Sequence, residues 1–152
     1  MSRLLLTLLL LGAPLLQAAE RLSEASVRQA YTQMQAAVAA QDVEAVLALM
    51  SADLQVQIQA PLDMGGELQL GRDEYRELLV QGWDGVDNYQ LQVEIQQIEI
   101  AEDGQSARID SLNRESMDIL GNSLVMNIEQ RATLQLSQQG PLFSHIQAVI
   151  RP

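Results

Sequence analysis

The stretch Ala39-Ala-Gln-Asp-Val-Glu-Ala-Val-Leu-Ala-Leu-Met-Ser-Ala-Asp53 predicts that one helix ends, a second short helix begins and a strand follows. Asp42 is a residue type that caps helix N-termini, so we expect the second helix to begin there. After Asp53, apolar residues alternate with glutamines, which is typical of a strand with one solvated face. The apolar residues of this strand are Leu54, Val56 and Ile58.

Helices are also predicted on either side of this stretch. Ser23 is a predicted N-cap, and the apolar residues behind it recur at three- and four-residue spacing, which indicates an amphipathic helix of about 17 residues. Downstream, Met64–Glu67 is glycine-containing and predicts a flexible loop. Gly71 then precedes a third helix with Asp73 and Glu74 in its first turn, where the helix dipole favours negative charge.

From residue 91 onward the sequence predicts four long strands joined by tight turns. The turns are expected at Asp103–Gly104, Leu120–Asn122 and Gln139–Pro141. The apolar phase slips by one residue across Gln96–Gln97, which predicts a β-bulge and therefore a bent sheet. Consecutive hairpins form an antiparallel meander, and the helices must cover one of its faces. The predicted class is α+β, in a single domain over residues 20–152.

Two motifs support a family resemblance. The run Ala39–Asp53 resembles the second-helix segment of the nuclear transport factor 2-like superfamily, which includes ketosteroid isomerases and SnoaL-like polyketide cyclases. Leu70-Gly-Arg-Asp-Glu-Tyr-Arg-Glu-Leu-Leu79 resembles the start of the third helix in that superfamily. The resemblance implies a cystatin-like cone, in which a curved antiparallel sheet wraps around three N-terminal helices and a central cavity.

The resemblance also argues against the best-known chemistry of that superfamily. It places Ile58 where ketosteroid isomerases carry the aspartate that acts as general base, and an isoleucine carries no proton. The oxyanion-hole tyrosine of the first helix falls near Met34, and the supporting tyrosine of the third helix falls at Leu79. Because one fold hosts many functions, activity must be argued from the site.

A cavity lined by aliphatic side chains, thioethers and one indole suits a hydrophobic ligand. The residues expected to line it are Tyr31, Met34, Leu54, Val56, Ile58, Leu79, Trp83, Met117 and Met126.

Five polar residues are weak catalytic candidates, because an acid, an arginine and a histidine that converge in an apolar cavity can transfer protons. They are Tyr31, Glu115, Glu129, Arg131 and His145, and Asn113 is a further polar candidate on the same strands. The alternative is structural: Tyr31 is a core residue with its hydroxyl at the rim, Glu129 and Arg131 form a solvated or intermolecular pair on the outer face, and His145 faces solvent.

Composition excludes several function classes. The net charge is -11 and all nine basic residues are arginines, so binding to nucleic acid is disfavoured. The chain has no cysteine and one histidine, which excludes disulfides and thiolate catalysis and disfavours a transition-metal site. We expect no metal and no cofactor.

Residues 1–19 predict a secretory signal peptide. Arg3 precedes an apolar run from Leu4 to Leu16, which is shorter than the roughly 20 residues that span a bilayer. Cleavage is expected after Ala18 or Ala19, which would place the mature protein in the bacterial periplasm or outside the cell, free of the membrane.

Three hypotheses follow. The leading one is an exported domain that binds a small hydrophobic ligand or a partner protein in or around the cavity, as a homodimer through the outer face of the sheet. The second is a cofactor-independent lyase, isomerase or hydrolase that acts on a hydrophobic substrate. The third is a non-catalytic dimerisation or assembly module.

Overall fold

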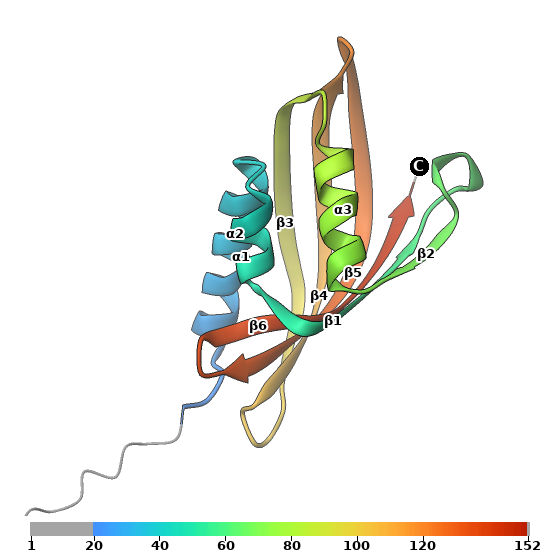
Figure 1. Ribbon diagram of the computed structural model, residues 1–152. Helices are drawn as coiled ribbons and strands as arrows, with labels where there is room; N and C mark the ends of the chain where they lie inside the picture. The colour runs from blue at the N-terminus through green and yellow to red at the C-terminus, as the bar shows by residue number, and fades with distance from the viewer. Residues whose placement is uncertain (1–19, 152) are drawn as a thin grey trace, which may run out of the picture.

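The computed structural model describes residues 20–151, so the predicted signal peptide lies outside the described residues. Figure 1 shows the elements in chain order. The helices are α1 (Glu24–Ala39), α2 (Val43–Ala48), the single 3-10 turn η1 (Leu62–Met64) and α3 (Arg72–Gly82). The strands are β1 (Met50–Gln59), β2 (Glu67–Leu70), β3 (Val86–Ile100), β4 (Ser106–Ile119), β5 (Asn122–Ser137) and β6 (Gly140–Arg151).

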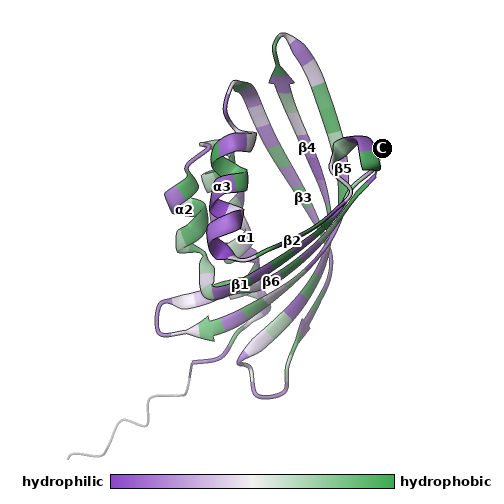
Figure 2. Cartoon of the chain, turned by 45° about the vertical axis from the view of Figure 1, so that its right-hand side comes forward, coloured by the Kyte–Doolittle hydropathy of each residue, from purple (hydrophilic) through white to green (hydrophobic). Residues whose placement is uncertain are grey.

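The strands form one sheet in the order β2-β1-β6-β5-β4-β3. All neighbours are antiparallel except β1 and β6, which run parallel. The sheet is curved and does not close, and the helices lie on its concave side (Figure 2). This architecture confirms the predicted α+β class and the antiparallel meander. Within residues 20–151, no helix has both the length and the apolar character needed to cross a membrane.

The predicted helix caps form as expected. The Ser23 hydroxyl accepts a hydrogen bond from the Ser26 backbone N–H at the start of α1. The Asp42 carboxylate accepts one from the Ala45 N–H at the start of α2, over 3.0 Å. Between the two helices Gln41 adopts a positive φ of 50°, which ends α1 and turns the chain into α2.

The sequence predicted a flexible loop at Met64–Glu67 and no strand between that loop and α3, which is wrong from Glu67 onward. Glu67–Leu70 forms β2, an edge strand that pairs antiparallel with the end of β1. Gly65 and Gly66, with φ of 113° and 69°, make the reversal that brings β2 back to β1. A four-residue strand is too short for its alternation to stand out in the sequence.

The core lies between the helices and the concave face of the sheet. Its largest fully buried side chains are Phe143, Ile109, Leu134, Val27 and Val46. The strand register shifts between Ile95 and Gln97, which confirms the predicted bulge. A second shift, between β5 and β6, was not predicted: Ser144 is an extra residue on β6, so Phe143 and Ile146 both point into the core.

Candidate functional site

A cavity of about 90 Å³ lies between α1, α3 and the concave face of the sheet. Its polar lining residues are Tyr31, Tyr75, Trp83, Tyr89, Asn113, Glu115 and Gln130. Its apolar lining residues are Met34, Val38, Met50, Leu79, Leu91, Val93, Phe143 and Ile146. A larger hollow of about 490 Å³ lies across the outer face of β3, β4 and β5. Its rim is made of exposed side chains such as Glu94, Leu112 and Arg114, so the inner cavity is the better enclosed candidate site.

Four of the residues expected to line the cavity do so: Tyr31, Met34, Leu79 and Trp83. The other five lie elsewhere. Leu54 and Val56 are buried in the core under the helices, and Ile58 packs against that core, beside Leu68 of β2 and Ala148 of β6. Met117 is buried and Met126 is half-buried, nearer the ends of β4 and β5 that are joined by the Leu120–Gly121 turn.

The five polar candidates divide between the two faces of the sheet. Tyr31 and Glu115 line the cavity. Arg131 is exposed and pairs with Asp110 over 2.7 Å, and Glu129 is exposed and pairs with Arg151 over 3.2 Å. His145 is half-buried beside Gln55 of β1 and Thr133 of β5, and its neighbour Ile146 is the residue that points inward. Acid, arginine and histidine therefore do not converge.

Glu115 lies instead among aromatic residues, of which the sequence predicted Trp83 but not Tyr75 or Tyr89 as part of the site. Burial raises the pKa of its carboxyl, and the neighbouring Tyr89 hydroxyl partly offsets that effect. Burial, with a smaller contribution from the Glu115 charge, raises the pKa of Tyr75 to about 12 and that of Tyr89 further. Trp83 packs edge-on against Tyr89, with ring centroids 5.9 Å apart. The carboxyl is thus held in a weakly polar, aromatic environment.

A second polar group, which we call the polar recess, consists of Tyr31, Ser111, Asn113 and Gln130. The Asn113 side-chain amide donates to Gln130 Oε1 over 3.0 Å. Burial raises the pKa of the Tyr31 hydroxyl, and the nearby side chains of Ser111 and Gln130 lower it by less. Asn113 was already a polar candidate from the sequence, whereas Ser111 was missed. The inward alternation of β4 could have found Ser111, because it shares the parity of buried Ile109.

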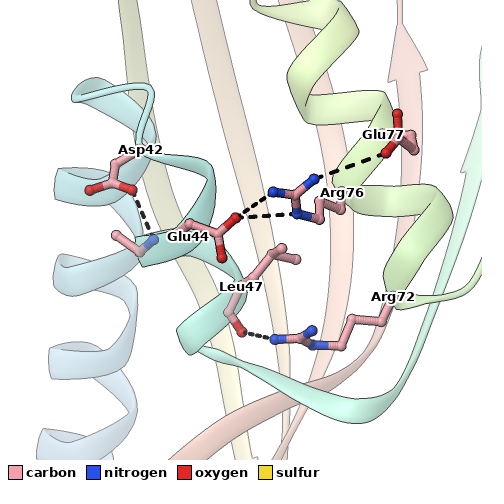
Figure 3. Close-up of polar contacts among 7 residues, drawn as sticks. Asp42, Glu44, Leu47, Arg72, Arg76 and Glu77 are labelled. Atoms are coloured by element: carbon pink, nitrogen blue, oxygen red, sulfur yellow. Dashed lines mark hydrogen bonds and ion pairs between the residues drawn. The ribbon is translucent and has the colours of Figure 1, made fainter.

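Polar contacts between α2 and α3 hold α3 over this cavity. Figure 3 shows Arg76 of α3 paired with Glu44 of α2, at 2.7 Å, and Arg72 donating to the Leu47 carbonyl, at 3.1 Å. The Arg76–Glu44 pair is exposed and contributes little stability by itself. The Arg72 contact is partly buried and places the first turn of α3, which carries Tyr75 toward the cavity.

The described residues offer no metal centre. Within residues 20–151, no three His, Asp or Glu side chains gather in an arrangement that could hold a metal ion. The cavity carries one carboxyl, two amides and three phenol hydroxyls, a donor set suited to hydrogen bonding with a neutral molecule.

Comparison with solved structures identifies the same fold. A conserved protein from Planctomyces limnophilus matches with a TM-score of 0.69 and 17% identity, covering 85% of this chain and 96% of that one. A ketosteroid isomerase-like protein from Erwinia carotovora matches with a TM-score of 0.66 and 17% identity, covering 84% and 95%. A hexachlorocyclohexane dehydrochlorinase matches with a TM-score of 0.68 and 10% identity, covering 84% of both chains.

At these identities the structural matches establish the fold alone. No curated protein matches the chain. The family model of the SnoaL-like domain matches residues 27–150, which run from the first turns of α1 to the end of β6. The chain therefore belongs to the SnoaL-like domain family.

Proposed function

We propose that this domain binds a small, mainly hydrophobic molecule in the cavity between α1, α3 and the sheet. One observation carries the proposal: the Glu115 carboxyl lies in a cavity lined mostly by apolar and aromatic side chains, with its pKa raised by burial. Among the ion pairs of residues 20–151, none includes Glu115. A buried carboxyl with no cation beside it lowers the free energy of unfolding. Ionisable groups with strongly shifted pKa values are found mainly at functional sites.

The size of the cavity limits the ligand. A volume of about 90 Å³ is well below the roughly 300 Å³ of a pocket for a drug-sized molecule. Apolar cavities of about 150 Å³ hold benzene in other proteins. The Met34 side chain in the wall is flexible and can adapt its shape to a guest. Because the present volume is below that of such a benzene-holding cavity, a ligand of the size of one substituted six-membered ring requires the cavity to widen, which movement of Met34 can provide.

Trp83 provides a direct test, because it lines the cavity and is the only tryptophan of the chain. Titration with toluene should change Trp83 fluorescence saturably. Leu91→Phe, which adds bulk to the cavity wall, should abolish the response. Leu112→Phe is the matched control, because Leu112 lies on the same sheet but is 47% exposed on its outer face. Absence of a saturable response in the unmodified protein would refute the proposal.

Proton transfer is a second candidate function. The observation that favours it is the proximity of the Glu115 carboxyl to the Tyr89 hydroxyl inside the cavity. A carboxylate can accept a proton from carbon, and a tyrosine hydroxyl can stabilise the oxyanion that forms. An isomerase-like protein and a dehydrochlorinase share this fold, which makes cofactor-independent proton transfer worth testing.

The test is hydrogen–deuterium exchange at the α-carbon of cyclohexanone in D₂O, followed by NMR. An active protein should accelerate the exchange, and Glu115→Gln should return it to the uncatalysed rate. Glu129→Gln is the matched control, since Glu129 is an exposed acid on β5 paired with Arg151. Equal rates with all three proteins would leave binding as the function.

Export and self-association also remain proposals. Residues 1–19 would direct export, and mass spectrometry of protein recovered from the medium or periplasm should show loss of the chain up to Ala18 or Ala19. Homodimerisation would use the outer face of the sheet, where Leu112 and Val125 are exposed among ion pairs. Light scattering during size-exclusion chromatography should then give twice the chain mass.

A further inference from the structure

We infer that the polar recess binds a hydroxyl group of the ligand, so that the domain selects small neutral alcohols and phenols. The inference rests on the proposed binding function and adds to it the chemical class of the ligand. The recess lies on the α1 side of the cavity, where Tyr31 approaches the inner faces of β4 and β5.

Within residues 20–151, three buried polar atoms in the recess make no hydrogen bond of normal geometry: the Tyr31 hydroxyl, Ser111 Oγ and Asn113 Oδ1. Their residues are only 3%, 3% and 7% exposed. The Tyr31 hydroxyl lies near the side chains of Ser111 and Gln130 but leaves Asn113 Oδ1 without a donor. Folded proteins satisfy the great majority of buried polar groups, because each unpaired group forfeits its hydrogen bonds to water. Three such unpaired polar atoms in one recess indicate that another molecule completes their hydrogen bonding.

The donors and acceptors of the recess favour a hydroxyl. The Asn113 amide nitrogen already donates to Gln130, which leaves Asn113 Oδ1 as an acceptor that needs a donor. The Tyr31 hydroxyl can donate to an oxygen in the same space. A ligand hydroxyl does both, accepting from Tyr31 and donating to Asn113. A carbonyl oxygen only accepts and would leave Asn113 Oδ1 unpaired.

The rest of the cavity favours a neutral ligand. Its lining contains no arginine that could pair with an anion, and ionised Glu115 would repel one. Asn113 and Glu115 occupy alternate positions on β4, so they share a face at about 7 Å spacing. A ligand anchored by its hydroxyl at Asn113 therefore extends along apolar walls toward Glu115, Tyr89 and Trp83.

Phenol and toluene test this inference, because they differ by the exchange of a hydroxyl for a methyl group. Each is titrated against the unmodified protein and against Tyr31→Phe, with Trp83 fluorescence as the readout. The substitution removes only the hydroxyl and keeps the ring that packs edge-on against Phe143. We expect it to weaken phenol binding roughly five- to tenfold, as for the loss of one buried hydrogen bond, and to leave toluene binding unchanged.

Thr133→Val is the matched control, because it removes a hydroxyl from the outer face of β5 and should alter neither affinity. Asn113→Leu is a second variant that should weaken phenol selectively. If both ligands bind and neither Tyr31→Phe nor Asn113→Leu discriminates between them, the recess holds only water and the inference fails while the proposed function stands. An equal loss for both ligands would also overturn the inference, since Tyr31 would then act only in packing. If neither ligand binds the unmodified protein, the proposed function itself fails.

Discussion

Replacing Phe143 by alanine should test the packing that holds α1 on the sheet and forms one wall of the cavity. Phe143 lies on β6, is 1% exposed, and its ring packs edge-on against Tyr31 of α1, with centroids 5.3 Å apart and planes at 80°. It is buried only because the bulge at Ser144 turns it to the same side as Ile146. The substitution therefore probes a contact that depends on tertiary structure.

The expected loss follows from two contributions. Removing the buried ring forfeits about 2 kcal/mol of transfer free energy. A residual void of about 100 Å³ costs roughly 24 cal/mol per Å³, or about 2.4 kcal/mol, if the walls do not collapse. The sum of about 4.4 kcal/mol lies within the usual range of roughly 3–5 kcal/mol for Phe→Ala in a core. Domains are typically stable by about 5–15 kcal/mol, so the variant should still fold in the absence of denaturant.

Urea unfolding, followed by Trp83 fluorescence and by far-ultraviolet circular dichroism, measures this loss. Phe143→Leu should lose less, about 1 kcal/mol, because most of the apolar volume remains. Val125→Ala, on the exposed outer face, should change the free energy of unfolding by less than about 0.5 kcal/mol. A loss below about 2 kcal/mol for Phe143→Ala, with an unchanged slope against urea, would show that the ring is not packed as described.

The enlarged cavity of Phe143→Ala should also accept larger guests. Because the void adjoins the existing cavity, indole should bind the variant more tightly than the unmodified protein. At a concentration ten times its dissociation constant, a guest raises the free energy of unfolding by about 1.4 kcal/mol. Absence of this gain would mean that the walls collapse into the space left by the ring.

Three further predictions concern single positions. Burial raises the pKa of Glu115 in the folded state, so folding becomes less favourable as pH rises from the unfolded-state pKa near 4.3 through the folded-state pKa. Glu115→Gln should therefore increase the free energy of unfolding at pH 7. Urea unfolding at a series of pH values should show that this increase disappears toward pH 4. Asp42→Ala removes the cap of α2 and should cost about 1 kcal/mol in the same assay, whereas an unchanged midpoint would show that the cap is replaced by solvent. Gly104→Ala should lower the thermal midpoint more than Gly121→Ala, since both have positive φ but only at Gly104 would a Cβ approach Arg21 to 2.8 Å; equal shifts would mean that Arg21 moves away freely.

Much of the fold was predictable because its determinants are local. Capping by Ser23 and Asp42 acts within one helical turn, and both caps form as predicted. The two-residue alternation of the long strands is likewise a local property, as is the phase slip that marks the bulge near Gln97. Edge strand β2 was missed, because four residues carry too little periodicity.

The site was only partly predictable, since it joins residues far apart in the chain. The alternation of β4 placed Glu115 on one face of the sheet, but it gave no indication that Tyr75, Trp83 and Tyr89 would surround the Glu115 carboxyl. The same parity would have placed Ser111 and Asn113 inward, but their lack of hydrogen-bond partners depends on what α1 and β5 bring against them. Phe143 was missed because an unpredicted bulge reversed its orientation.

The sequence by itself determined the class of fold, because residue spacing, capping and turn chemistry act between near neighbours in the chain. Its motifs also carry the resemblance to the family, and that resemblance places Ile58, not an acid, at the position of the isomerase base. Only the tertiary structure decided that Arg131 pairs with Asp110 and Glu129 with Arg151, while Glu115 and Tyr31 line one cavity. The physical reason is that burial depends on which elements pack over a face, and that packing is settled by contacts between residues distant in sequence.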